Sequence, residues 1–274
     1  MTIAHIIILL GTGVGVGFAS GLLGVGGGFI MVPVQYILYQ DMGLSANMSL
    51  LMAFGTSLLV ILPTAASGAW RHHKNGAVWW KAAIIMGPCG AVAAFGGASL
   101  GAHIPEGILR IVFGVVVLAS GIWMLILKSL KSESEVKDSP WLWIAWAIPI
   151  GMVTGLTGLG GGIVAVPVMV LALKFKVHNA IATSLAMIMF NSAGGVVGYI
   201  INGLDVPNLS AYSIGYVNLT AWFLLAVTSI GMAQVGAVTA HRLPAWQLRW
   251  IFIAVTFYVA LRMLGVFDLL GWPV

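Results

Sequence analysis

Charged residues are scarce in this sequence. Only 7% of its 274 residues are Asp, Glu, Lys or Arg, whereas 60% are hydrophobic. A soluble domain carries about 25% charged residues, so the composition excludes a soluble protein and indicates a multi-pass protein of the cell membrane that contacts the lipid bilayer. Long apolar runs favour helices over the alternating strands of a barrel. The predicted fold class is therefore an all-α polytopic membrane protein.

Carboxylates are missing from the interiors of the apolar runs. All seven acidic residues fall in expected loops or near expected helix ends: Asp41, Glu106, Glu133, Glu135, Asp138, Asp205 and Asp268. This argues against a cation pump with an acidic proton relay and against a carboxylate-lined pathway for divalent metals. The six histidines lie at segment ends without the spacing of metal ligands. We therefore expect no metal and no cofactor.

Cysteine is nearly absent too. The single Cys89 excludes an intrachain disulfide. No arrangement of nucleophile, base or metal ligands indicates catalysis, so an enzyme is not expected. The net charge of +5 does not indicate a nucleic-acid partner, because the lysines and arginines are scattered between apolar runs, as topology determinants are.

Two glycine-rich stretches interrupt the apolar runs. Gly21–Gly28 is followed by Phe29-Ile30-Met31-Val32-Pro33, and 134 positions later Gly155–Gly162 is followed by Ile163-Val164-Ala165-Val166-Pro167. Each glycine costs a helix about 1 kcal/mol relative to Ala, so neither segment is expected to be one continuous helix. A broken hydrophobic segment at matching places in two halves is the best sequence indication of a transporter's binding site.

The first glycine cluster divides residues 3–39. As one helix this segment would span about 55 Å, against a hydrocarbon core of about 30 Å, so we expect a hairpin-like element. The second cluster divides 141–175 in the same way. Each hairpin is followed by three expected transmembrane helices, at about 44–70, 78–100 and 105–127 and at about 178–201, 217–240 and 244–266. The predicted domains are a first transmembrane repeat (1–127), a charged cytoplasmic linker (128–139) and a second transmembrane repeat (140–274).

The duplication extends beyond the glycines. Thr56-Ser57-Leu58 recurs as Thr183-Ser184-Leu185, and Pro105 with Arg110 recurs as Pro244 with Arg249. Positive charges at 71–81, at 174–176 and at 242 are expected on the cytoplasmic side. Residues 3–39 then start and end outside, and 141–175 start and end inside. We predict an inverted repeat with a pseudo-twofold axis in the membrane plane; conventional spans throughout are the alternative.

The glycine clusters are the candidate binding site. Where a helix restarts after Gly28 or Gly162, its first N–H groups lack intrahelical partners and carry partial positive charge. Glycine lets these amides approach an anion closely. We predict that two such clusters meet near the midplane and bind an anion without a buried lysine, through Gly24, Gly26, Gly27, Gly28, Gly158, Gly160, Gly161 and Gly162. The alternative is close helix packing through small residues.

Four hydroxyls follow the two hairpins and are candidate donors to a bound oxyanion. They belong to Thr56, Ser57, Thr183 and Ser184. Hydrogen bonding within or between helices is the alternative interpretation.

Three further side chains are candidates. Asn191 lies seven residues after Ser184 on the same helical face and is costly in lipid unless paired; its counterpart in the first half is Thr64. Arg110 is expected near the outside, against the charge rule, and is a candidate gate or entry funnel for anions. Arg249 is equivalent by the repeat, although snorkelling to the cytoplasmic surface also explains it.

The doubled motif resembles that of the TauE/SafE family of sulfite exporters, also called TSUP transporters. The matching residues are Gly24-Val25-Gly26-Gly27-Gly28-Phe29-Ile30-Met31-Val32-Pro33 and Gly158-Leu159-Gly160-Gly161-Gly162-Ile163-Val164-Ala165-Val166-Pro167, with Thr-Ser-Leu in the following helix of each half. The similarity covers about residues 10–270. It implies transport of small sulfur-containing anions such as sulfite, sulfoacetate or related organosulfonates.

The expected function is secondary transport of a small sulfur-containing oxyanion by alternating access around a midplane site, with export as the direction that the resemblance implies. An anion channel or a uniporter for another small anion stays open, as does a membrane subunit without transport activity. The coupling ion and a homodimeric state are also open.

Overall fold

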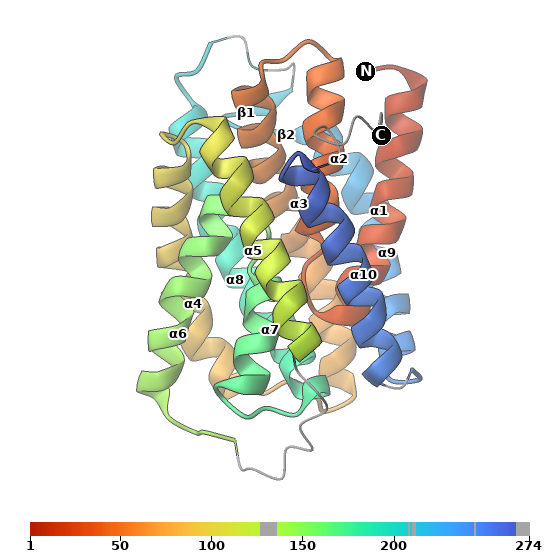
Figure 1. Ribbon diagram of the computed structural model, residues 1–274, viewed down its shortest axis with the longest axis vertical. Coiled ribbons are helices and arrows are strands. Elements are labelled where there is room, and N and C mark those ends of the chain that lie inside the picture. The colour runs from red at the N-terminus through yellow and green to blue at the C-terminus, as the bar shows by residue number, and fades with distance from the viewer. Residues whose placement is uncertain (127–135, 208, 210–211, 244, 267–274) are drawn as a thin grey trace.

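The structure is a computed structural model that describes the chain except for residues 127–135, 208, 210–211, 244 and 267–274 (Figure 1). In the described part, the first half contains α1 (Ile3–Leu23), α2 (Gly28–Asp41), α3 (Ala46–Lys74), α4 (Trp80–Gly101) and α5 (Glu106–Ile126). The second half contains α6 (Pro140–Thr157), α7 (Gly162–Leu171), α8 (Val177–Gly203), α9 (Leu219–Ala240) and α10 (Ala245–Met263). Seven of these helices are long and apolar enough to cross a membrane.

The all-α membrane class predicted from the composition is confirmed, and the helices begin and end within a few residues of the expected positions. One element was not expected. A short antiparallel hairpin of β1 (Ser213–Ile214) and β2 (Val217–Asn218) lies before α9. Its strands have two residues each, too few to show an alternating pattern in the sequence.

Both glycine-broken segments turn back on themselves. His5 Nε2, near the start of α1, lies 2.8 Å from Asp41 Oδ2 at the end of α2. In the second half, the Lys137 N–H before α6 donates to the Leu173 carbonyl after α7 at 3.1 Å. Figure 1 shows the open ends of the two hairpins at opposite ends of the molecule. The predicted linker at 128–139 lies mostly outside the described residues.

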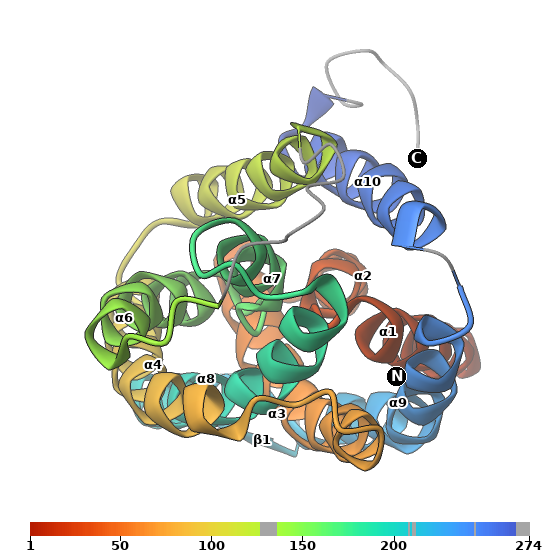
Figure 2. The ribbon, with the colours of Figure 1, turned by 90° about the horizontal axis from the view of Figure 1, so that it is seen from below.

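Equivalent elements of the two halves pack in matching pairs. Helix α1 packs on α9 as α6 packs on α4, and α3 packs on α9 as α8 packs on α4. Figure 2 shows α4 with α6 on one flank and α1 with α9 on the other, with α2, α3, α7 and α8 between them. This matched packing supports our proposal that the halves are repeats of opposite orientation.

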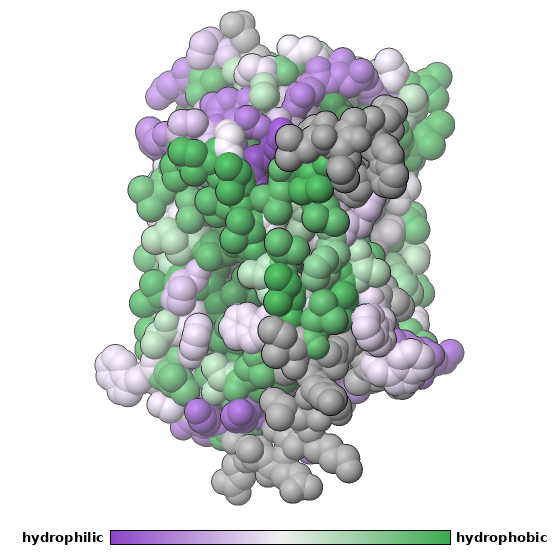
Figure 3. All heavy atoms as spheres, in the orientation of Figure 1, coloured by the Kyte–Doolittle hydropathy of each residue, from purple (hydrophilic) through white to green (hydrophobic). Residues whose placement is uncertain are grey.

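The molecular surface is arranged for a bilayer. Figure 3 shows a broad hydrophobic band between two more polar ends. Large side chains such as Ile84, Val92 and Phe223 are exposed on the helices. At one end of the molecule Lys81 Nζ lies 2.7 Å from Asp138 Oδ1. The same end carries most of the described lysines and arginines. The positive-inside rule predicts that this end faces the cytoplasm.

Candidate functional site

Two tight glycine turns join the helices of the hairpins. Gly24, Gly26 and Gly27 have φ of 71°, 79° and 78°, and Gly158, Gly160 and Gly161 have φ of 66°, 76° and 81°. Side chains strongly disfavour this left-handed region. Gly24 and Gly158 end α1 and α6, whereas Gly27 and Gly161 cap the starts of α2 and α7. Glycine at these positions is therefore required by the backbone.

The two turns contact each other. A Cβ on Gly28, at the start of α2, would lie 2.7 Å from the Gly158 carbonyl oxygen of the other turn. In the reciprocal contact, a Cβ on Gly162, at the start of α7, would overlap the carbonyl oxygen of Gly24. The starts of both short helices thus lie inside the molecule next to the opposite turn, as predicted from the duplicated motif.

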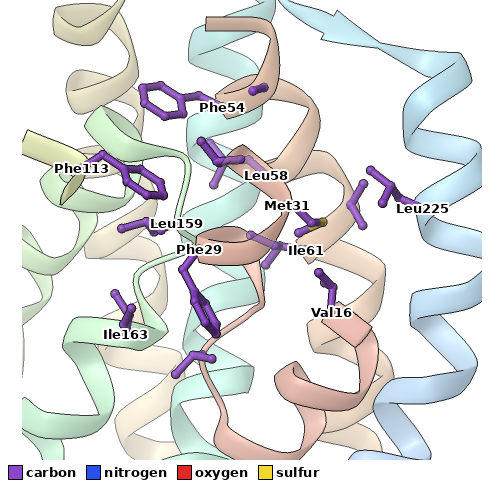
Figure 4. Close-up of a cluster of buried hydrophobic side chains, with 14 of the residues drawn as sticks. Val16, Phe29, Met31, Phe54, Leu58, Ile61, Phe113, Leu159, Ile163 and Leu225 are labelled. Atoms are coloured by element: carbon purple, nitrogen blue, oxygen red, sulfur yellow. The ribbon is translucent and has the colours of Figure 1, made fainter. Parts of the chain in front are cut away.

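Apolar side chains fill the junction of the turns. Ile61 of α3 and Ile188 of α8 occupy equivalent positions of the two halves, and both contact the first turn. A Cβ on Gly26 would be 3.2 Å from Ile61 Cγ2 and 3.6 Å from Ile188 Cγ2. Figure 4 shows Ile61 in one cluster of buried side chains with Phe29 and Leu159, both fully buried. An anion that contacts the turns must displace part of this cluster.

The start of α7 presents backbone donors at this junction. The first intrahelical hydrogen bonds run from the N–H groups of Val164 and Ala165 to the Gly161 carbonyl, at 3.1 and 2.8 Å. The amides of Gly162 and Ile163 precede these bonds and have no partner within the helix. They carry the partial positive charge of a helix N-terminus.

Asn191 lies beside the same helix start. Its side chain is fully buried, and neither Oδ1 nor Nδ2 has a hydrogen-bond partner among the described residues. Nδ2 is 3.5 Å from the position of a Cβ on Gly161, and a Cβ on Gly90 of α4 would overlap Oδ1. An unpaired buried amide costs about 1–3 kcal/mol, a cost that a ligand hydrogen-bonded to Asn191 would offset.

The equivalent position in the first half is different. Thr64 donates to the Val60 carbonyl at 2.8 Å and lies 2.8 Å from the hydroxyl of Ser229 in α9. Its hydrogen-bonding capacity is used. Of this equivalent pair, only Asn191, beside the second turn, has side-chain polar atoms without a partner among the described residues. The two half-sites are therefore chemically unequal.

The candidate threonines have partners on the opposite half. Thr56 Oγ1 accepts from the backbone N–H of Asn218 at 2.9 Å, and Thr183 Oγ1 accepts from that of Trp79 at 3.0 Å. Asn218 and Trp79 are the N-cap residues of α9 and α4. These bonds support the alternative interpretation, hydrogen bonding between helices, and a role for these hydroxyls as anion donors stays a prediction.

The candidate serines are also hydrogen-bonded. Ser184 donates to the Gly24 carbonyl at 2.8 Å and so fixes the first turn from α8. Ser57 accepts from Gln35 Nε2 at 2.9 Å. Ser184 thus contacts the first turn and Ser57 contacts α2, and a role for these hydroxyls as anion donors stays a prediction.

The candidate arginines are not brought to the turns by any contact of the described residues. Arg110 Nε donates to the Met263 carbonyl at the end of α10 at 2.9 Å, and its guanidinium lies 3.8 Å from Glu106. These contacts account for a cation at the external end. The side chain of Arg249, in α10, lies outside the described residues. A gating role for either residue stays a prediction.

Sequence reasoning missed two polar residues near the turns. Thr154 of α6 is buried, and its Oγ1 occupies the place that a Cβ on Gly161 would take. Ser20 of α1 is its equivalent at the 134-residue shift, and its buried Oγ has no partner among the described residues. Both residues carry a hydroxyl and lie 134 positions apart, the shift of the glycine motif, and this spacing could have identified them from the sequence.

Known proteins resemble this chain over nearly its whole length. The family model described as sulfite exporter TauE/SafE matches residues 9–263. A probable membrane transporter protein of Methanocaldococcus jannaschii is 29% identical over 96% of this chain and 95% of its own length. Relatives with the same description from Haemophilus influenzae and Xylella fastidiosa are 29% and 31% identical, covering 94% and 96% of this chain and 97% of each relative. No solved structure matches the chain significantly.

Proposed function

Because this chain belongs to the sulfite exporter TauE/SafE family, we propose that it is a secondary transporter that exports a small sulfur-containing oxyanion, such as sulfite or a sulfoacetate-like organosulfonate. Membrane transport itself follows from the family and from its relatives, which are described as probable membrane transporters. We propose the substrate and the direction of transport from the family, and the binding site from the arrangement of the glycine turns.

The observation that carries the proposal is the unpaired amide of Asn191 beside the start of α7. Asn191 Nδ2 and the N–H groups of Gly162 and Ile163 are donors in one buried region. An oxyanion accepts hydrogen bonds from several donors at once, and such charge-assisted bonds contribute about 1.5–3 kcal/mol each. A cation would meet the positive end of a helix dipole and is disfavoured here.

The site would bind the anion without a buried cation. Oxygen atoms on sulfur would accept from the backbone amides of α7, and the Asn191 amide would fix their orientation. Ile61 and Ile188 would move aside as the anion enters, because they occupy the junction. Around the bound anion they would exclude water and so strengthen each hydrogen bond.

Alternating access would use the matched packing of the halves. Each glycine hairpin opens toward one end of the molecule and contacts the other hairpin at its turn. A rocking movement of one hairpin with its flanking helices would expose the site to one side at a time. The reciprocal Gly28–Gly158 and Gly162–Gly24 contacts would be the fixed point of this movement.

Purified protein in liposomes tests the proposal. Labelled sulfite inside vesicles should exchange with external unlabelled sulfite, saturably and at equal pH on both sides. Sulfate, phosphate, acetate and taurine as external competitors define the selectivity, and vesicles without protein give the background. Absence of exchange with sulfite, thiosulfate and sulfoacetate would overturn the proposed function. Flux that never saturates would instead indicate an anion channel.

A further inference from the structure

Three histidines from three different elements converge at the cytoplasmic end. His72 lies in the last turn of α3, His178 in the first turn of α8, and His241 directly after α9. The rings of His72 and His241 are 5.1 Å apart, and that of His178 stacks on His241 at 5.7 Å with an interplanar angle of 22°. The cluster thus joins both halves of the molecule, at a place remote in sequence from the glycine turns.

The hydrogen bonds fix the tautomers of two of these rings. His72 Nε2 lies 3.1 Å from the Gly21 carbonyl oxygen. A carbonyl only accepts, so His72 carries its hydrogen on Nε2 and, when neutral, has an acceptor at Nδ1. His241 Nε2 lies 3.2 Å from that Nδ1 and must donate to it. One continuous chain of hydrogen bonds therefore runs from exposed His241 through fully buried His72 to the backbone of α1.

This chain accepts one proton without rearrangement. A proton from cytoplasmic water can form an N–H bond at Nδ1 of His241, and both existing hydrogen bonds then remain. A second proton would have to bind Nδ1 of His72, where two N–H groups would face each other. The neighbouring groups oppose additional charge. They are Arg71 on α3 and His178 on α8, and among the described residues no carboxylate faces the cluster.

The cluster is also connected to the candidate anion site. His72 holds the carbonyl of Gly21, three residues before Gly24 begins the first glycine turn. Gly21 itself contacts α9, since a Cβ there would overlap the Ala233 carbonyl oxygen. Separation of His241 from His72 would therefore loosen the end of α9 from α3 beside the helix that leads into the turn. Among the described residues, no group of His, Cys, Asp or Glu has the arrangement of a metal site, which favours a proton as the ligand.

We propose that His72, His178 and His241 form the proton-binding site that couples anion transport to proton movement. The inference rests on the proposed transport function and extends it to the coupling ion. Partial burial, together with the charges of His178 and Arg71, lowers the pKa of His241 below its ordinary value, so that the neutral form predominates near neutral pH and protonation responds to cytoplasmic acidification.

Two measurements on reconstituted full-length protein separate this inference from the proposed function. The first is sulfite exchange at equal pH, which needs no net proton movement. The second is net sulfite accumulation driven by an imposed pH gradient. With one coupled proton, the accumulation ratio of the wild type should change about tenfold per pH unit. His72→Gln and His241→Gln should retain exchange and lose this dependence. The matched control is His73→Gln, because His73 is exposed and bonds to Trp80.

Each outcome decides the matter. Exchange without any response of the wild type to the pH gradient would overturn the histidine inference and leave the transport proposal intact. A full response in His241→Gln would overturn it as well, and this variant decides if His72→Gln fails to fold. Absence of sulfite exchange in the wild type would overturn both proposals. Loss of the response in His241→Gln but not in His73→Gln supports the inference.

Discussion

The side-chain amide of Asn191 lies against the second glycine turn, with Nδ2 3.5 Å from the position that a Cβ on Gly161 would occupy. The two residues come from α8 and from the cap of α7. Their contact places an unpaired amide beside a helix N-terminus within the hydrophobic interior. The unpaired amide lowers the stability of the protein but would contribute to anion binding. A change at Asn191 should therefore shift stability and anion affinity in opposite directions.

Replacement of Asn191 by leucine should stabilise the protein and weaken anion binding. Leucine has the same branching and the same number of side-chain heavy atoms and removes an unpaired buried amide that costs about 1–3 kcal/mol, so the melting temperature of the purified protein should rise by a few degrees. Loss of a hydrogen bond to a charged ligand should lower sulfite affinity about tenfold or more. Thermal unfolding with and without sulfite measures both effects.

Thr64→Val is the matched control for this experiment. Thr64 occupies the equivalent position, but its hydroxyl is paired with Val60 and Ser229. Valine should therefore destabilise the protein by about 1 kcal/mol and leave sulfite affinity unchanged. Wild-type affinity in Asn191→Leu would show that the amide does not contact the substrate. Substitutions at Gly161 are a poorer test, since its φ of 81° strains any side chain.

Gly28→Ala should destabilise the protein, although the change is only one methyl group. The new Cβ would lie 2.7 Å from the Gly158 carbonyl oxygen and 2.8 Å from Leu159 Cα. Both are backbone atoms that cannot rotate away, so the turns must separate at a cost of about 1–3 kcal/mol. Gly96→Ala in α4 is the control, since nothing lies within 4 Å of its Cβ position. It should stabilise by up to about 1 kcal/mol. Equal melting temperatures for the two variants would contradict the close contact of the turns.

The helices could be predicted from the sequence because glycines, prolines and charges mark their ends. Asn75-Gly76, Pro105 and Pro140 all lie at or next to helix boundaries. The hairpin shape was predicted from three features together: the length of residues 3–39, which exceeds the thickness of a bilayer, the glycine cluster within them, and the placement of positive charges. These signals are local in the sequence, so they can be recognised without knowing which helices pack against one another.

The partners of polar side chains could not be predicted in this way. Thr56 and Asn191 are both polar and both lie inside apolar helices, but Thr56 accepts from the backbone N–H of Asn218, whereas Asn191 faces Gly90. Which of them is left without a partner depends on the packing of α9 and α4, and a single sequence does not specify it. The histidine cluster could not be predicted for the same reason. His72, His178 and His241 lie at the ends of three helices that meet only in the folded protein.

Thr183→Val should reduce stability without changing substrate affinity. The threonine hydroxyl accepts from the Trp79 N–H at the start of α4, and valine has the same shape but no acceptor. The unpaired N–H should cost about 1–3 kcal/mol. Thr239→Val is the control, since that hydroxyl is exposed and bonds only to its own helix; its melting temperature should change little. A loss of sulfite-induced stabilisation in Thr183→Val would instead support the hydroxyl as an anion donor.

Thermal stability in detergent should decrease as the pH falls below about 6.5. The pKa of His241 is lowered from 6.5, first by partial burial and then by His178 and Arg71. Between the lowered pKa and 6.5 the unfolded chain binds more protons than the folded protein, so the free energy of unfolding falls with pH in that window and is unaffected by this group above it. His241→Gln should flatten the melting-temperature profile between pH 8 and 5. His103→Gln, at the other end of the molecule, should follow the wild type; so would His241→Gln if the histidine cluster were not intact in solution.

Cysteine accessibility should show that each glycine hairpin enters and leaves the membrane on one side. In a Cys89→Ser background, cysteines at Thr2, before α1, at Met42, after α2, and at His103, between α4 and α5, should react with a membrane-impermeant maleimide in intact cells. Cysteines at Lys176, after α7, and at Asn75, between α3 and α4, should react only after permeabilisation. His103 and Asn75 fix the two sides independently of the hairpins, so Thr2 together with Met42 tests the first hairpin and Lys176 tests the second. Both hairpins must lie as in the structure if the halves are inverted repeats, because α2 or α7 crossing fully would reverse every later span. Protection of Thr2 with labelling of Met42 would contradict the first hairpin, and labelling of Lys176 in intact cells would contradict the second.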